Sequence, residues 1–218
     1  MSLTLHYAPG ACSFVPHVLL QASGAPFEPA LLKLHKGEQR EPAYLSINPR
    51  GQVPVLVDNG TVITQIVAIC LHLDARFPEA HFLPSEPMAR AKALETLAWM
   101  NNTVHPTFTH YFMPGKFTDQ PDAQAALKTH AVAQYRQLMS ELQQLLQASQ
   151  QAGQAWMSGT RVGPLDAYAL TLLRWGSIAG INPEDFPALW AHVQRVADDA
   201  AVKAVMERER LVLNLYKG

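Results

Sequence analysis

The 218-residue chain contains only two cysteines, Cys12 and Cys70, which are too few for a disulfide framework. We therefore expect a reducing, cytoplasmic setting, which would keep Cys12 available as a thiol. Charged residues make up only 16% of the chain and nearly cancel, with 17 Lys and Arg against 18 Asp and Glu. Because the sequence has no run of basic residues, it does not favour nucleic acid or an anionic membrane as a partner.

Long apolar runs are also missing. No stretch approaches the roughly 20 apolar residues that a helix needs to cross a bilayer, and the amino-terminus does not have the pattern of a signal peptide. Apart from His105, the histidines show no ligand-like spacing with cysteines or carboxylates, so we expect no metal site. The chain is instead rich in apolar residues, 48% of the total, which suffices for a sizeable core in one or two domains.

The segment around Cys12 joins a predicted strand to a predicted helix. An alternating apolar pattern predicts the strand at 1–7, and Pro9 with Gly10 ends it. Cys12 then lies at the positive end of a helix predicted at 13–22. A helix N-terminus favours the thiolate, so we expect the pKa of Cys12 to be lowered. The alternative is an inert packing residue, as most free cysteines are.

Three further strands are predicted before residue 80, at 27–34, 53–57 and 61–64. Pro29 favours an edge position for the first of them. The turn Asp58-Asn59-Gly60 predicts an antiparallel hairpin between the other two. A helix predicted at 65–77 completes the order β-α-β then β-β-α, which indicates a thioredoxin-like α/β domain over residues 1–80.

Strand signals disappear after a proline-rich linker at 81–87, and residues 88–218 are predicted to form an all-α helical bundle. Helical periodicity and turn residues predict helices at 88–112, 123–147, 164–178, 187–196 and 202–211. Pro106 predicts a kink or a break in the first of these helices.

Four stretches carry a resemblance that covers nearly the whole chain. They are Tyr7-Ala-Pro-Gly-Ala-Cys-Ser-Phe-Val-Pro-His17, Ile47-Asn-Pro-Arg-Gly-Gln-Val-Pro-Val-Leu56, Thr64-Gln65-Ile66-Val-Ala-Ile69, and Asp166-Ala-Tyr-Ala-Leu after Gly163-Pro164. In this order they resemble the cytosolic glutathione transferases, and the first resembles the opening of the bacterial beta class. The resemblance implies a detoxifying enzyme, with glutathione as co-substrate and a small hydrophobic electrophile as partner. It also implies a homodimer.

The resemblance implies a role for each of a set of residues. The catalytic residues would be Cys12, Ser13, Tyr7 and His105. The residues that bind glutathione would be Cys12, Lys36, Gln52, Val53, Pro54, Gln65, Ile66 and His105. The Val53–Pro54 bond would be cis, which exposes the Val53 N–H and C=O groups to a peptide-like ligand. The electrophile would lie against Pro9, Gly10, Phe108, Thr109 and Phe112.

Several residues depart from the family pattern. Ile66 stands where the family mostly has Ser or Thr, so it keeps the backbone N–H that suits a carboxylate but has no hydroxyl donor. We expect glutathione to bind roughly ten- to a hundredfold more weakly for that reason, unless another group compensates. The alternative for Ile66 is an apolar residue that packs inward. Gln65 replaces a usual glutamate, Pro106 a frequent lysine, and Gly163 a Ser or Thr cap, the last at a cost of only a few tenths of a kcal/mol.

The residues leave several functions open. A glutathione thiolate would give conjugation, whereas a Cys12 thiolate would give a mixed disulfide and hence thiol-transferase or peroxidase activity. A non-catalytic ligand-binding or interaction protein with weakened glutathione affinity is the alternative that Ile66 motivates. A glutathione-dependent isomerase or dehalogenase is a third option. Lys36 could equally be a solvated lysine with no role in binding, and His105 a packed histidine with no role in catalysis.

Overall fold

The computed structural model describes residues 2–217; Met1 and Gly218, at the ends of the two predicted domains, lie outside the described residues. The strands are β1 (Leu3–Tyr7), β2 (Glu28–Leu31), β3 (Val55–Asp58) and β4 (Thr61–Thr64). The α-helices are α1 (Phe14–Ser23), α2 (Pro42–Leu45), α3 (Ile66–Arg76), α4 (Pro87–Trp99), α5 (His105–Phe112), α6 (Pro121–Gln151), α7 (Pro164–Ile178), α8 (Pro187–Ala197) and α9 (Ala200–Glu209).

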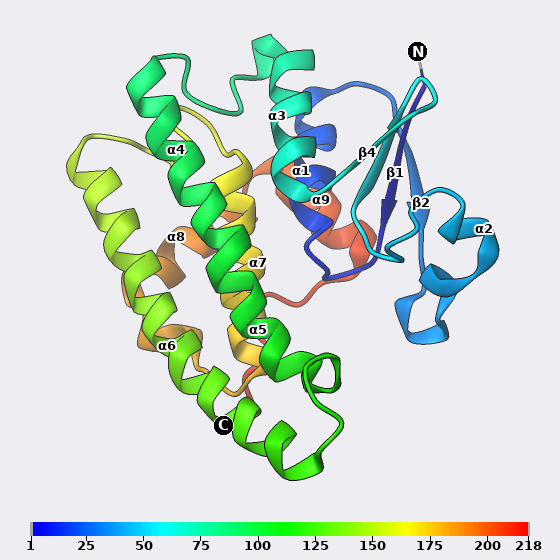
Figure 1. The fold of residues 1–218 in the computed structure, drawn as a ribbon. Helices are drawn as coiled ribbons and strands as arrows, with labels where there is room; N and C mark the ends of the chain where they lie inside the picture. Colours follow the sequence, from blue (N-terminus) through cyan, green and yellow to red (C-terminus); the bar gives the residue numbers. More distant parts are fainter. Residues whose placement is uncertain (1, 218) are drawn as a thin grey trace.

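The described strands form one sheet in the order β2-β1-β3-β4 (Figure 1). β1 pairs parallel with β2 and antiparallel with β3, and β3 pairs antiparallel with β4. The predicted thioredoxin-like order is confirmed, and Pro29 lies in an edge strand. Asn59 and Gly60 have φ values of 48° and 85°, the left-handed conformation that a two-residue hairpin turn requires.

Three predicted strands are shorter in the structure, and the one expected at 1–7 begins at Leu3. The strand expected at 27–34 is limited to β2, and the strand expected at 53–57 begins only at Val55. Pro54 has no N–H to donate to a ladder, so the sheet starts after it. The Val53–Pro54 bond is cis, as the resemblance implied.

The helix expected at 88–112 consists of α4 and α5 joined by a π-helical turn, Met100–Val104. The irregularity lies just before Pro106, which is itself the second residue of α5. Proline offers no N–H to the carbonyl four residues earlier and crowds that turn, so the hydrogen bonds widen there. α9 begins two residues earlier than predicted, because the Asp199 carboxylate accepts from the N–H groups of its first turn.

The larger hydrophobic core runs through both predicted domains. Phe82 and Leu83, within the predicted linker at 81–87, are only 1% and 4% exposed, so the linker is packed into this core. Helix α1 contacts α3 as well as α7 and α9, and Figure 1 shows α9 beside it. The turn that carries Cys12 leads into α1 and therefore lies where the sheet half meets the helical half.

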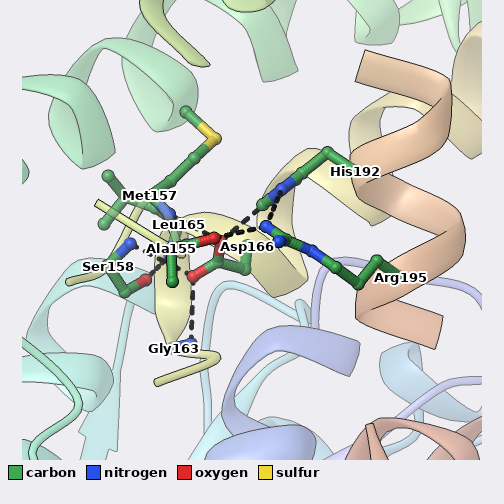
Figure 2. A network of polar contacts seen from close by, with 8 residues as sticks. All are labelled: Ala155, Met157, Ser158, Gly163, Leu165, Asp166, His192 and Arg195. Carbon is green, nitrogen blue, oxygen red and sulfur yellow. Dashed lines mark hydrogen bonds and ion pairs between the residues drawn. The ribbon is translucent and has the colours of Figure 1, made fainter. Parts of the chain in front are cut away.

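Asp166, in the first turn of α7, binds the loop that precedes the helix. Its carboxylate accepts from the N–H groups of Met157, Ser158 and Gly163 at 2.8, 3.1 and 3.1 Å (Figure 2). It also lies 2.9 Å from Nε2 of His192 in α8. A carboxylate is favoured at a helix N-terminus by the macrodipole, so Asp166 stabilises the start of α7 as well as the loop before it. None of the described helices combines the length and hydropathy that a membrane span would need.

Candidate active site

Cys12 lies in the turn between β1 and α1 and is 9% exposed. Its thiol donates to the carbonyl oxygen of Val53, with 3.5 Å between sulfur and oxygen. These residues are 41 positions apart in the sequence. The fold thus places the only thiol of the turn directly beside the segment predicted to dock a peptide-like ligand.

The prediction that the pKa of Cys12 is lowered is wrong in this structure. Burial raises the pKa of Cys12 to about 12, because water no longer solvates the thiolate. The backbone N–H groups of Cys12 and Ser13 lower the pKa, as expected at a helix N-terminus, but their effect is smaller. Cys12 is therefore a protonated thiol at neutral pH.

Ser13 and Tyr7 flank the Cys12 turn. The Ser13 hydroxyl is fully buried, accepts from the N–H of Ala8 at 3.1 Å and donates to the carbonyl of the same residue at 3.2 Å. Its hydrogen bonds therefore brace the turn. The Tyr7 ring lies 4.6 Å from the ring of His17. Burial and then the Glu209 charge raise the pKa of Tyr7, so its hydroxyl stays protonated.

The predicted docking segment is held by its neighbours. The carbonyl of Gln52 accepts from the Tyr44 hydroxyl at 2.7 Å and from Nδ2 of Asn48 at 2.8 Å. Val53, the next residue, is half-buried, and Pro54 is buried. These contacts fix the backbone that leads into the Val53 peptide group.

Gln65 and Ile66 lie where α3 begins. Gln65 is exposed and has φ 74° and ψ 127°, an unusual conformation for a residue with a side chain, of a kind that clusters at ligand sites. Ile66 is 3% exposed and belongs to the core, so the inward-packing interpretation of its side chain is confirmed. Lys36 is exposed at the end of a short 3-10 turn, Leu34–Lys36.

His105 is the first residue of α5, and its Nδ1 lies 2.7 Å from the Tyr168 hydroxyl. Tyr168 in turn donates to Oδ1 of Asn101 at 3.4 Å. We assign the ring hydrogen to Nδ1, because both hydrogen bonds are then satisfied and Nε2 is left as an acceptor. Burial, assisted by the charge of Lys116, lowers the pKa of His105 to about 4. The ring is therefore neutral at physiological pH.

Trp175 in α7 contacts several predicted site residues, although no sequence motif pointed to it. Its Nε1–H donates to the carbonyl of Gly10 at 2.8 Å, across 165 residues of sequence. Its ring centroid is 4.8 Å from those of both His105 and Phe108. Phe108 is nearly parallel to Trp175, at 18°, and to Phe112, at 15°. Trp175 thus connects the Gly10 turn to the predicted electrophile residues of α5.

The remaining predicted electrophile residues differ in exposure. Pro9 is exposed, and Thr109 is half-buried with its hydroxyl donating to the His105 carbonyl at 3.2 Å. Phe112 is 56% exposed at the outer end of the aromatic stack. A cavity of about 220 Å³ between α4 and α6 is lined by none of the predicted site residues.

The fold and the site define a glutathione-transferase type of protein: a thioredoxin-like half with a cysteine turn beside a cis-proline segment, followed by a helical half. Models of the glutathione S-transferase N-terminal and C-terminal domains match residues 1–75 and 100–199. The chain is 31% identical to the glutathione S-transferase GstA of Escherichia coli O157:H7 over 212 residues, covering 96% of this chain and 100% of that protein. The chain belongs to the glutathione S-transferase family of enzymes.

Solved structures have the same fold. A sphingomonad glutathione S-transferase complexed with glutathione superposes with a TM-score of 0.79 at 29% identity, covering 96% of this chain and 100% of that one. The bacterial beta-class glutathione S-transferase of Sphingomonas chungbukensis gives a TM-score of 0.80 at 27% identity, with the same coverage. The resemblance to the bacterial beta class, first seen in the residues around Cys12, therefore extends to the fold.

Proposed function

We propose that the protein binds glutathione and transfers its thiol to hydrophobic electrophiles. Residues 1–80 would hold glutathione across Val53 and the start of α3, and residues 88–218 would supply the electrophile site. The observation that carries this proposal is the 3.5 Å contact between the Cys12 sulfur and the Val53 carbonyl. A peptide-like ligand that adds itself to the Val53 edge would bring its own cysteine beside Cys12.

The protonation state of Cys12 favours conjugation over mixed-disulfide chemistry. Burial raises the pKa of Cys12 to about 12, so very little of it is thiolate at neutral pH. Disulfide exchange needs a thiolate as the attacking group. A neutral thiol can instead turn its hydrogen from the Val53 carbonyl to the glutathione sulfur and stabilise the anion there.

His105 is proposed to accept a hydrogen bond and not to act as a general base. With a pKa of about 4, its imidazole is too weakly basic to hold a proton taken from a thiol at neutral pH. The assigned Nδ1 hydrogen leaves Nε2 as an acceptor, which would orient a donor in the site. His105 then contributes position and polarity, with Tyr168 fixing its ring.

The electrophile is proposed to be a flat aromatic molecule. Trp175, Phe108 and Phe112 form a nearly parallel series of rings, and Phe112 is exposed at its end. Offset stacking on such a surface is a favourable arrangement for another aromatic ring. This narrows the hydrophobic electrophile class that the sequence predicted.

Calorimetric titration with glutathione and conjugation of chlorodinitrobenzene test the proposal. Cys12→Ser replaces the S–H donor with an O–H donor and should retain turnover to within several-fold. Cys12→Ala removes the donor and should lower turnover by roughly tenfold or more. Cys70→Ala is the matched control, because that cysteine lies on α3, fully buried in the hydrophobic core and outside the predicted site. Absence of both binding and turnover in the wild type would overturn the proposal.

The same measurements separate the alternatives. Glutathione binding without turnover of any electrophile would favour a ligand-binding protein, which the missing hydroxyl at Ile66 motivates. Thiol-transferase or peroxidase activity that is lost equally in Cys12→Ser and Cys12→Ala would favour a mixed disulfide. We further propose a homodimer that works in detoxification in a reducing cytoplasm. Light scattering should then give twice the chain mass of 24.0 kDa.

A further inference from the structure

The turn that carries Cys12 is held from the other end of the chain. The N–H of Gly10 donates to Oε2 of Glu209 at 2.9 Å, across 199 residues of sequence. The Gly10 carbonyl accepts from Trp175 at 2.8 Å. The peptide groups on both sides of Gly10 are therefore bound by the helical half, one by α9 and the other by α7.

Gly10 itself shows how closely the helical half approaches the turn. Its φ of 68° lies in the left-handed region that favours glycine. A Cβ at this position would lie 2.8 Å from Nη1 of Arg174, which is too close for any side chain unless the arginine moves. The backbone conformation favours glycine where α9 and α7 bind the turn, and a side chain there would also have to displace the Arg174 guanidinium.

Glu209 is placed against two local rules. It is the last residue of α9, where the helix dipole disfavours a carboxylate, and its side chain is fully buried, which is costly for a charge. The carboxylate is satisfied by the Gly10 N–H and by Nδ1 of His17 at 2.7 Å. Residues that break local rules in this way are expected mainly at functional or strained sites.

Charged and aromatic groups complete the surroundings of this carboxylate. Nε2 of His17 lies 3.5 Å from Nη1 of Arg208, so the histidine connects the carboxylate to an arginine. Burial lowers the pKa of Arg174, and the Glu209 charge raises it. The His17 ring also packs against Tyr7 at the start of the turn. Glu209 thus acts on the Cys12 turn at two places, directly at Gly10 and through His17 at Tyr7.

We propose that Glu209 is a positioning residue that holds the Cys12 turn closed against Val53 through the N–H of Gly10. The effect of Glu209 on catalysis rests on the proposed transferase function. The closed turn itself is a property of the protein that can be measured without glutathione.

The structure offers a matched control in a second buried pair. His192 and Asp166 are fully buried and 2.9 Å apart, and Nη2 of Arg195 lies 3.3 Å from the other ring nitrogen (Figure 2). This pair repeats the chemistry of His17 and Glu209 at the start of α7. Trp175 lies nine residues beyond Asp166 on the same helix, about 13 Å along its axis. Breaking the second pair therefore disturbs the fold without touching the Cys12 turn.

The test is the rate at which iodoacetamide alkylates each cysteine, followed peptide by peptide by mass spectrometry without glutathione. Cys70 is fully buried and reports general unfolding. In Glu209→Ala, Cys12 should react on the order of tenfold faster, with Cys70 unchanged, because the opened turn exposes the thiol to water. Glu209→Gln keeps an oxygen acceptor for the Gly10 N–H and should stay near the wild-type rate. His192→Asn should leave the ratio of the two cysteines unchanged.

Two results would overturn the proposal: a wild-type Cys12 rate in Glu209→Ala, or equal acceleration of both cysteines. Should Glu209→Ala fail to fold, Glu209→Met fills the same space without an acceptor, and the same outcomes apply to it. In the active enzyme, the expected signature is a fall in kcat larger than the rise in KM for glutathione. If the wild type does not bind glutathione, the proposed transferase function is wrong. The alkylation rates would still show whether Glu209 holds the Cys12 turn closed.

Discussion

The hydroxyl of Ser158 lies 2.7 Å from the position that a Cβ on Gly163 would occupy. It accepts from the N–H of Leu165 at 3.1 Å, a bond that a Ser or Thr at the N-cap of α7 would ordinarily make. A Cβ on Gly163 would also meet the carbonyl of Phe82 at 2.5 Å. The expectation that Gly163 is merely a slightly weaker cap is therefore wrong, because the cap hydroxyl comes from Ser158 and needs glycine beside it.

Ser158→Ala should accordingly lower the free energy of unfolding by about 1–2 kcal/mol, since it leaves the Leu165 N–H unpaired. Gly163→Ser, usually an improvement at an N-cap, should cost about 1–3 kcal/mol through overpacking. Urea unfolding at neutral pH measures both. Gly115→Ser is the control, because a Cβ there makes only an ordinary contact. A stabilised Gly163→Ser variant would contradict this assignment of the cap.

The parts of the fold that could be predicted have local signals. The Asp58-Asn59-Gly60 turn sets the β3–β4 hairpin, and the Gly163-Pro164 pair marks the start of α7 to the residue. Two features that also have local causes were placed less well. The start of α9 depends on the Asp199 side chain, and the π-helical turn depends on how Pro106 disturbs residues before it.

The site residues divide into those that a sequence motif indicated and those that only distant contacts reveal. The cis bond at Val53–Pro54 was implied by a motif. Trp175 and Glu209 had no signal, because each is linked to Gly10 across more than 160 residues of sequence. The pKa of Cys12 was predicted in the wrong direction for a related reason. The helix N-terminus is visible in the sequence, whereas the burial that outweighs it depends on tertiary packing.

Ile66→Thr should strengthen glutathione binding and weaken the fold. The added hydroxyl at the start of α3 supplies a donor to the glutathione carboxylate, so Kd should fall by roughly tenfold. Loss of a buried ethyl group should lower stability by about 1–2 kcal/mol. Calorimetric titration and urea unfolding measure the two effects. Ile69→Thr, equally buried in the same helix but one turn further on, should lose stability with no gain in affinity; an unchanged Kd in Ile66→Thr would contradict the prediction.

His105 should make stability depend on pH in the acid range. Its pKa is about 4 in the folded protein, against 6.5 for an ordinary histidine. Between these values the unfolded chain binds a proton that the folded chain does not, so stability rises with pH and is lost as the pH falls toward 4. The full shift corresponds to about 3 kcal/mol.

Urea unfolding of the wild type and of His105→Gln measures this contribution. Between about pH 7 and about pH 4.5, the wild type should lose about 2 kcal/mol more than the variant, since only the wild type has a buried imidazole to protonate. His110→Gln serves as control for loss of a histidine outside the Tyr168 contact. Equal losses in the wild type and His105→Gln would show that His105 is not held neutral by the fold.

The aromatic series in α5 and α7 predicts which electrophiles are preferred. Phe108 lies at 18° to Trp175 and at 15° to Phe112, so a flat substrate that stacks on Phe112 would extend an existing series of rings. Phe112→Ala should then raise KM for chlorodinitrobenzene by roughly three- to tenfold, which corresponds to about 0.5–1.5 kcal/mol of stacking. KM for glutathione should not change, because its proposed contacts lie at Val53 and Gln65.

Phe117 separates stacking from general apolar contact. It is 51% exposed, close to the 56% of Phe112, but its ring packs on His110 at 4.4 Å and lies outside the series. Phe117→Ala should therefore leave KM for both substrates unchanged, and Phe112→Leu should fall between the wild type and Phe112→Ala. For an alkyl halide, which cannot stack, the wild type and Phe112→Leu should differ much less. If Phe112→Ala and Phe117→Ala raise KM equally, the site selects by apolar surface alone and the aromatic preference is lost.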